Sequence, residues 1–182
     1  MPLSHYSQAK ASLNMYEPVQ VNLFEATILT PLNPDAGLIL EHVKSIQGLQ
    51  NINPSVDAVT QKFKQADRSY AGMPSQTFVD LTFVFTLNLN DANENYIYKQ
   101  MRDWYALTYN PLTGEYGLKK DYVGTLIIVQ HNRPGKIFRK LTFKHVFPIQ
   151  QPQAMDTLDY TTPEPAELTM VLRSDFWNEE NS

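Results

Sequence analysis

The residues that could perform acid–base or metal chemistry are few and scattered in this sequence. The four histidines, His5, His42, His131 and His145, form no HExxH pattern and no pair at i and i+4, the spacing that directs two imidazoles at one metal ion. The chain has no cysteine, which excludes disulfides, thiolate zinc sites and cysteine nucleophiles. Each histidine is therefore interpreted as a surface or hydrogen-bonded residue, and the sequence predicts no metal and no cofactor.

Carboxylates gather in and next to a proline-rich stretch, Gln150 to Ala166. Asp156, Asp159, Glu164 and Glu167 could supply the paired carboxylates of general acid–base catalysis, but no base or nucleophile lies near them in sequence. The patterns GxGxxG, GxxxxGK[ST] and GxSxG are also absent. A solvated loop explains these acids better, and we expect no enzymatic activity.

Positive charge gathers in one part of the chain. The basic residues concerned are Arg133, Lys136, Arg139, Lys140 and Lys144. They could form an ordinary solvated face, or a patch that meets acidic surface on another copy of the chain, because complementary charges fix register and partner choice. The loop acids and the pair Glu179 and Glu180 could supply that surface. The net charge of −4 gives no general case for binding nucleic acid through phosphates.

The element that positions these basic residues is a predicted β-hairpin. Its arms run from Tyr122 to Gln130 and from Lys136 to Phe147, around the turn signal Asn132–Gly135. The second arm alternates with a period of two: one face carries Ile137, Leu141, Phe143 and Phe147, and the other carries Lys136, Lys140, Thr142 and Lys144.

The first arm of the hairpin is apolar on both faces. Val123, Ile127 and Val129 alternate there with Leu126 and Ile128. A strand of this kind needs cover on both sides. One cover can be the core of the domain, and the other a helix or a neighbouring subunit.

Further elements follow from periodicity and from helix and turn signals. Strands are predicted at Asn22–Thr30, Gly37–Ile46, Thr77–Leu89 and Glu167–Trp177, and a helix follows the capping signal Asp91–Glu94 with the apolar stripe Ile97, Met101, Trp104, Tyr105 and Thr108. Strands with one mid-chain helix favour a β-rich α+β fold, an antiparallel sandwich or barrel with a flanking α-helix. With 182 residues, the chain is predicted to form a single domain, 1–182.

Two long segments lack a pattern of their own. Residues 1–18 are interpreted as an N-terminal arm, and the segment from Gln47 to Ser75 as a long polar loop that a partner orders. Inside that loop, Val56, Val59 and Phe63 have helix-like spacing, while residues 61–64 fit a hairpin arm equally well. No signal peptide is recognised at the start, and no apolar run approaches the ~20 residues of a membrane helix, so we expect a protein made and used without export or membrane insertion.

The order of elements resembles a known family. The resemblance rests on the strand Asn22–Leu29, a helix carrying Asp103–Trp104, the long hairpin, the strand end Phe143–Pro148 and the terminal strand Leu168–Trp177. Together these segments resemble the tail tube proteins of T4-like contractile phages, and the match is best from Phe78 to the C-terminus. The departures are the longer N-terminal arm, the Gln47–Ser75 segment and the proline-rich connection after Gln150.

The resemblance implies a structural virion protein with the tail-tube fold. Six copies would form a ring, and rings would stack into the inner tube that conducts DNA from the capsid to the host. Expected partners are other copies of the chain, the tail sheath, baseplate and tail terminator proteins, and phage DNA in transit without sequence-specific binding. Assembly would occur in the host cytoplasm and the product would reside in the virion tail.

The same resemblance suggests roles for particular residues. Contacts between subunits are expected from Ile127, Ile128, Arg133, Lys136, Lys140 and Lys144. The lumen candidates come from the polar face of the long strand and are Asp80, Thr82, Thr86 and Asn88. We expect a neutral or acidic lumen, because basic residues repeated in every ring would hold the phosphates of the passing DNA.

Two alternatives stay open at this point. Within the same class, the chain could be a baseplate tube-initiating protein or a tube ring of a type VI or related secretion machine. In another class, it could be a monomeric β-barrel that binds a small ligand in its interior.

Overall fold

The computed structural model describes residues 20–32, 39, 41–52, 56–64, 66–72, 78–87, 96–154, 161 and 163–181. Its centre is a seven-stranded antiparallel sheet with the strand order β1-β8-β9-β11-β5-β2, to which β10 adds beside β11. The strands are β1 (Phe24–Leu29), β2 (Val43–Gln47), β5 (Val79–Thr86), β8 (Gly124–His131), β9 (Ile137–Pro148), β10 (Gln153–Ala154) and β11 (Glu167–Asn181). This arrangement confirms the predicted fold class, a curled, mostly antiparallel sheet with few helices.

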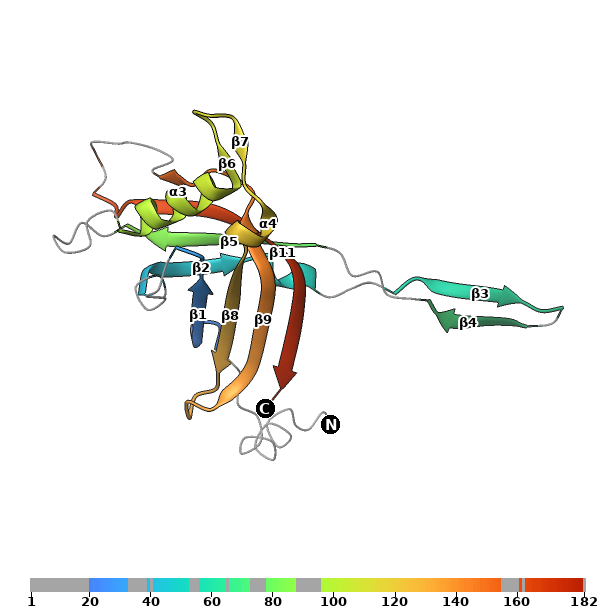
Figure 1. Ribbon diagram of the computed structural model, residues 1–182. Helices are drawn as coiled ribbons and strands as arrows, with labels where there is room; N and C mark the ends of the chain where they lie inside the picture. Colours follow the sequence, from blue (N-terminus) through green and yellow to red (C-terminus); the bar gives the residue numbers. More distant parts are fainter. Residues whose placement is uncertain are drawn as a thin grey trace.

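The sheet has two halves that share one strand. The first part of β11, Glu167–Ser174, pairs with β5, while the part from Leu172 to Asn181 pairs with β9. We call β1, β8, β9 and the C-terminal part of β11 the front half, and β2, β5 and the N-terminal part of β11 the back half. Figure 1 shows the front strands fanning out from the back strands, so the sheet curls around its own core.

A β-bulge lies at the bend between the halves. Gly124 pairs with Val146 whereas Thr125 pairs with Lys144, so His145 is the extra residue on β9, and its φ of 54° is unusual for a residue with a side chain. The bulge reverses which face each side chain takes. Val146 is buried, and Phe147, which the period of two places with Leu141 and Phe143, instead lies on the outer face. The prediction for Phe147 is therefore wrong.

The core lies between the two halves and beside the long helix. Its largest fully buried side chains are Trp104, Phe83, Phe85, Phe143, Ile28, Ile39, Leu81, Ile97, Met101, Leu126, Ile128 and Leu141. The predicted helix is confirmed as α3 (Tyr96–Thr108), which buries Ile97, Met101 and Trp104. The Trp104 indole Nε1 donates a hydrogen bond of 2.7 Å to the carbonyl of Tyr122, which ties α3 to the short helix α4 (Lys119–Tyr122).

The predicted hairpin is confirmed, but other boundaries differ from expectation. The long strand is shorter, Val79–Thr86, and the last strand is longer, because it continues to Asn181. Among the described residues of the second predicted strand, 39, 41 and 42 are helical and 43–46 are extended, as part of β2. The capping signal Asp91–Glu94 and the N-terminal arm 1–18 lie outside the described residues.

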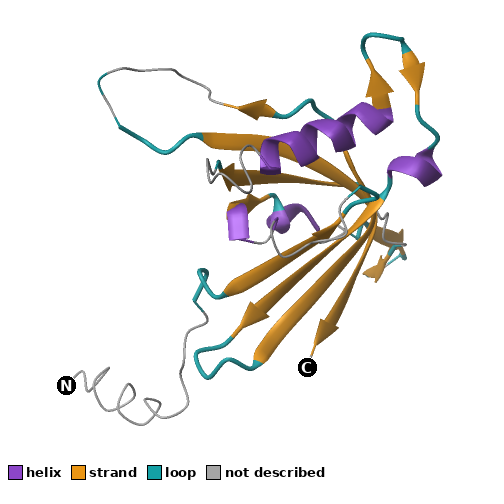
Figure 2. Cartoon of the chain, turned by 60° about the vertical axis from the view of Figure 1, so that its left-hand side comes forward, coloured by secondary structure: helices purple, strands orange, loops and turns teal. Residues whose placement is uncertain are grey.

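The segment predicted as a long loop contains regular structure. It begins with the end of β2 and the 3₁₀ helix η1 (Leu49–Ile52), followed by β3 (Ala58–Lys62) and β4 (Asp67–Ala71), which form an antiparallel hairpin. The hairpin alternative for residues 61–64 is thus confirmed for the strand residues Gln61 and Lys62. A third pair of strands, β6 (Tyr109–Asn110) and β7 (Glu115–Tyr116), follows α3. Figure 2 shows α3 beside the back half and the β6–β7 hairpin beyond its end. Across the described residues, no helix is long and apolar enough to span a membrane.

Candidate assembly surfaces

Several strand edges of the central sheet have no pairing partner among the described strands. β1 pairs with β8 alone, and β2 pairs with β5 alone. The C-terminal part of β11 pairs with β9 on one side, while its pairing with β5 ends at Ser174. The front half therefore has free edges on both sides, which offer backbone hydrogen-bond groups to another chain.

The outer face of the front half mixes apolar, polar and charged side chains. Across the strands, the registers place Leu29–Thr125–Lys144–Phe176, Thr27–Ile127–Thr142–Asn178 and Glu25–Val129–Lys140–Glu180 in three rows. The four ionisable residues of these rows carry two positive and two negative charges. The face is therefore balanced in charge, with partly exposed apolar groups between the charges.

The two isoleucines predicted at subunit contacts lie on opposite faces of β8. Ile127 is half-buried on the outer face, where another molecule can reach it. Ile128 is 1% exposed and belongs to the core of its own chain, so its side chain is not available to a neighbouring subunit. The sequence showed that both faces are apolar but not which face the core covers.

The basic residues divide into paired and unpaired groups. Lys140 Nζ lies 2.9 Å from Glu180 Oε2, and Arg139 Nε lies 2.7 Å from Glu179 Oε1. Two of the acids that could have met the basic residues of another copy are thus paired within the same chain. Arg133 and Lys136 are exposed in the turn between β8 and β9. Lys144 is exposed on β9.

Three of the four predicted lumen residues, Asp80, Thr82 and Thr86, lie on the outer face of the back half. Asp80 accepts two hydrogen bonds, of 2.7 and 2.8 Å, from Arg173 on β11. These hydrogen bonds hold the pKa of the Asp80 carboxyl below its ordinary value, against the opposing effect of partial burial. Thr82 and Thr86 are half-buried on the same strand face. Asn88 lies outside the described residues, as do Asp156 and Asp159 of the proline-rich connection.

The β3–β4 hairpin, which we call the arm, projects away from the rest of the molecule (Figure 1), and every residue of its two strands is exposed. Val59 lies opposite Tyr70 on one face, and Phe63 lies near the tip, where its N–H donates to the Ala66 carbonyl. The Arg68 guanidinium lies over the Phe63 ring, 5.7 Å from its centroid. The arm therefore carries an apolar face that nothing in the described chain covers.

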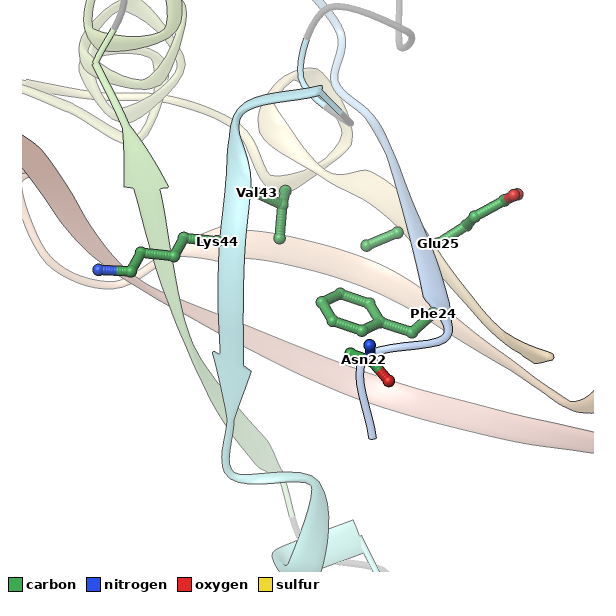
Figure 3. A pocket seen from close by; sticks show the side chains of 6 residues that line it. Asn22, Phe24, Glu25, Val43 and Lys44 are labelled. Atoms are coloured by element: carbon green, nitrogen blue, oxygen red, sulfur yellow. The ribbon is translucent and has the colours of Figure 1, made fainter. Parts of the chain in front are cut away.

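A cleft of about 320 Å³ lies between the edge strands β1 and β2. Its lining residues are Asn22, Phe24, Glu25, Ala26, Val43 and Lys44. Figure 3 shows Phe24 and Val43 pointing into the space between the strands, while Glu25 and Lys44 point away from it on either side. Two apolar side chains therefore point into the cleft, while polar atoms make up the larger part of its exposed lining.

These surfaces carry no constellation typical of a metal enzyme. Within the described ranges, no group of three or more His, Asp and Glu side chains could hold a metal ion.

Comparison with solved structures identifies the fold. The chain is similar to a chain of the sheath–tube complex of an extracellular contractile injection system, PVC, in the extended state, with a TM-score of 0.56 and 13% identity over 99% of this chain and 100% of that chain. The chain has the tail-tube fold.

Two further structures with this fold belong to related particles. The tube-terminating cap of the anti-feeding prophage gives a TM-score of 0.58 at 13% identity over 92% of this chain and 94% of that one. The PVC sheath/tube terminator in the extended state gives a TM-score of 0.55 at 12% identity over 91% of this chain and 99% of that one. No protein-family model matches the sequence, and no curated protein matches it significantly. The resemblance to tube proteins is therefore confirmed at the level of fold.

Proposed function

We propose that this protein is a structural, non-enzymatic subunit of the inner tube of a contractile tail, in which six copies form a ring and rings stack. The observation that carries the proposal is the tail-tube fold, combined with a front half that has free strand edges on both sides. The protein would act with sheath, baseplate and terminator proteins as partners.

The two free edges of the front half are different from each other. One is β1 and the other is the C-terminal part of β11, so an edge-to-edge contact between copies joins unlike surfaces. Contacts between unlike surfaces produce rings when the rotation closes. Ring closure of this kind would also satisfy the backbone groups that both edges leave unpaired.

The arm supports stacking of the rings. A two-stranded hairpin is marginally stable by itself in water, and ordering its residues costs roughly 1–2 kcal/mol each in backbone entropy. The exposed Val59, Phe63 and Tyr70 provide apolar area that would offset this cost when it is buried against another copy. We therefore assign the arm to contacts between rings or between adjacent subunits.

The charges on the outer faces of the back half and of the front half suit a channel for DNA in transit. On the back half, Asp80 pairs with Arg173 and Lys44 pairs with Glu167. On the front half, Glu25 and Glu180 balance Lys140 and Lys144. Neither face presents the excess of positive charge that holds phosphates, so a ring lined by either one would let DNA slide. Asp80, Thr82 and Thr86 remain our candidates for the lumen.

The ligand-binding alternative receives no support from the interior of the sheet. The space between the two halves is filled by fully buried side chains that include Trp104, Phe83, Phe85 and Phe143. A small-molecule barrel instead encloses a cavity lined with convergent polar groups.

The test is the size and shape of the purified protein. Light scattering and negative-stain electron microscopy should show rings or tubes at high protein concentration. A compact particle of 20.9 kDa at every concentration, alone and with a sheath protein, would contradict the proposal.

A further inference from the structure

The open cleft between β1 and β2 has two apolar side chains directed into it and polar groups around them. Phe24 and Val43 line its interior, and its volume is about 320 Å³. An apolar protein cavity of about 150 Å³ already accommodates benzene. The cleft is therefore large enough for an aromatic ring, which would contact Phe24 and Val43 there.

The tip of the arm carries an aromatic side chain in a suitable position. Phe63 is 53% exposed and lies directly after the end of β3. Figure 1 shows the arm extending away from the side of the sheet where β1 and β2 lie, so its tip does not face the cleft of its own chain.

The charges near the two partners are complementary. The Arg68 guanidinium lies over the Phe63 ring. If the ring entered a pocket, the guanidinium would therefore lie at the rim of that pocket. At the rim of the cleft, Lys44 is already paired with Glu167. The Glu25 side chain is 63% exposed, and its ion-pair partner among the described residues is His131, at 3.6 Å. Glu25 is thus an acid that an incoming arginine can pair with.

We infer that Phe63 at the tip of the arm inserts into the β1–β2 cleft of a second copy, where Arg68 pairs with Glu25. This inference rests on the proposed function, because it names the surface that receives the arm. The contact joins the exposed Phe63 of one copy to Phe24 and Val43 of another. It uses different parts of each copy, so it can repeat from ring to ring.

Charge reversal tests the pairing directly. Arg68→Glu and Glu25→Arg should each raise the protein concentration needed for assembly by at least about tenfold, the scale expected when an anchor contact is lost. Combining the two in one chain should restore assembly, because the pair is re-formed with its charges exchanged. Arg102→Glu, on the exposed side of α3, is the matched control and should leave assembly unchanged.

Substitution of the anchor tests the insertion. Phe63→Ala should prevent or weaken assembly at least as much as either charge reversal, whereas Phe63→Tyr should retain most of it. Tyr116→Ala removes an aromatic side chain that is 82% exposed on β7 and serves as the control for loss of a surface aromatic.

The absence of cysteine allows a third test by crosslinking. Chains with Arg68→Cys, mixed with chains with Glu25→Cys and oxidised mildly, should form a disulfide-linked pair. Arg68→Cys mixed with Thr113→Cys, in the turn between β6 and β7, should not. Rings or tubes that form without the Arg68–Glu25 crosslink, or that tolerate Phe63→Ala, would overturn the inference and leave the tube proposal standing. A parent protein that never assembles would overturn both.

Discussion

Replacing Ile127 and Ile128 one at a time separates folding from assembly. The two residues are neighbours on β8, yet Ile128 is 1% exposed in the core and Ile127 is half-buried on the outer face. We predict that Ile128→Ala destabilises the isolated chain, whereas Ile127→Ala changes its stability little and acts on assembly instead.

The size of the difference follows from burial. Truncating a fully buried isoleucine to alanine costs about 2–5 kcal/mol, because apolar contacts are lost and a cavity remains. In a domain of this length, 1 kcal/mol lowers the melting temperature by about 2–4 °C, so a loss of about 3 kcal/mol lowers it by about 6–12 °C. Surface substitutions usually stay within about 0.5 kcal/mol, which predicts a change of about 2 °C or less for Ile127→Ala.

The aspartate variants sharpen the contrast. Ile128→Asp would place an unpaired carboxylate in the core and cost several kcal/mol, a large share of the roughly 5–15 kcal/mol that stabilises a native protein. Ile127→Asp should leave a folded monomer that no longer forms rings. Thermal unfolding followed by circular dichroism, at a concentration too low for assembly, measures the first effect, and electron microscopy the second. Equal melting temperatures for Ile127→Ala and Ile128→Ala would refute the assignment of the two faces.

Three further predictions concern the arm, an ion pair and two glycines. Replacing residues 56–72 with a short linker should leave the circular dichroism of the folded sheet intact but abolish stacking of the rings. Normal tubes from this variant would show that the arm makes no essential assembly contact. The hydrogen bonds from Arg173 lower the pKa of the Asp80 carboxyl in the folded chain. The pair therefore stabilises the fold fully at a pH above the pKa that Asp80 has in the unfolded chain. This stabilisation is lost as the pH falls through the lower pKa of the folded chain. Asp80→Asn should therefore lower the free energy of unfolding by up to about 1 kcal/mol at pH 7, since the pair is partly exposed. Denaturant unfolding of the parent and the variant measures this difference. A difference that stays the same in acid would contradict the account. Gly48→Ala should destabilise the protein more than Gly114→Ala. Both glycines have a positive φ, but an added Cβ at Gly48 would lie 2.4 Å from the Asp80 carbonyl oxygen, whereas at Gly114 it would meet nothing within 4 Å. Equal melting temperatures for the two variants would argue against the clash at Gly48.

Much of the fold could be predicted from sequence because periodicity records which face of each element is buried. The stripe Ile97, Met101 and Trp104 gave the helix, and the alternation around Phe83 and Phe85 gave the long strand, since burial of one face is a local property of the pattern. The turn at Asn132–Gly135 was equally visible, because Asn, Pro and Gly have their own backbone preferences. Its Asn132 side chain accepts a hydrogen bond from the N–H of Lys136.

The failures arise where a contact distant in sequence overrides the local pattern. The extra residue His145 on β9 moves Phe147 from the core face to the outer face of the sheet. No feature of the sequence around His145 predicts this bulge. The pairing of Lys140 with Glu180 depends on the register of β9 against β11, which composition does not reveal. The β1–β2 cleft is also invisible in the sequence, because it exists only when the ends of the sheet face each other.

The strand β11 gives the molecule an unusual mechanical property. The halves of the sheet share this one strand, which turns at Ser174, where the hydroxyl oxygen lies 3.0 Å from the Lys144 carbonyl oxygen and 2.8 Å from that of Phe176. A load applied to the C-terminal part of β11 passes to the back half along a continuous covalent backbone. A load on β1, β8 or β9 first crosses the hydrogen bonds that join these strands to β11. In a long polymer driven forward by a contracting sleeve, such a subunit would transmit thrust through its own chain without coming apart at the bend.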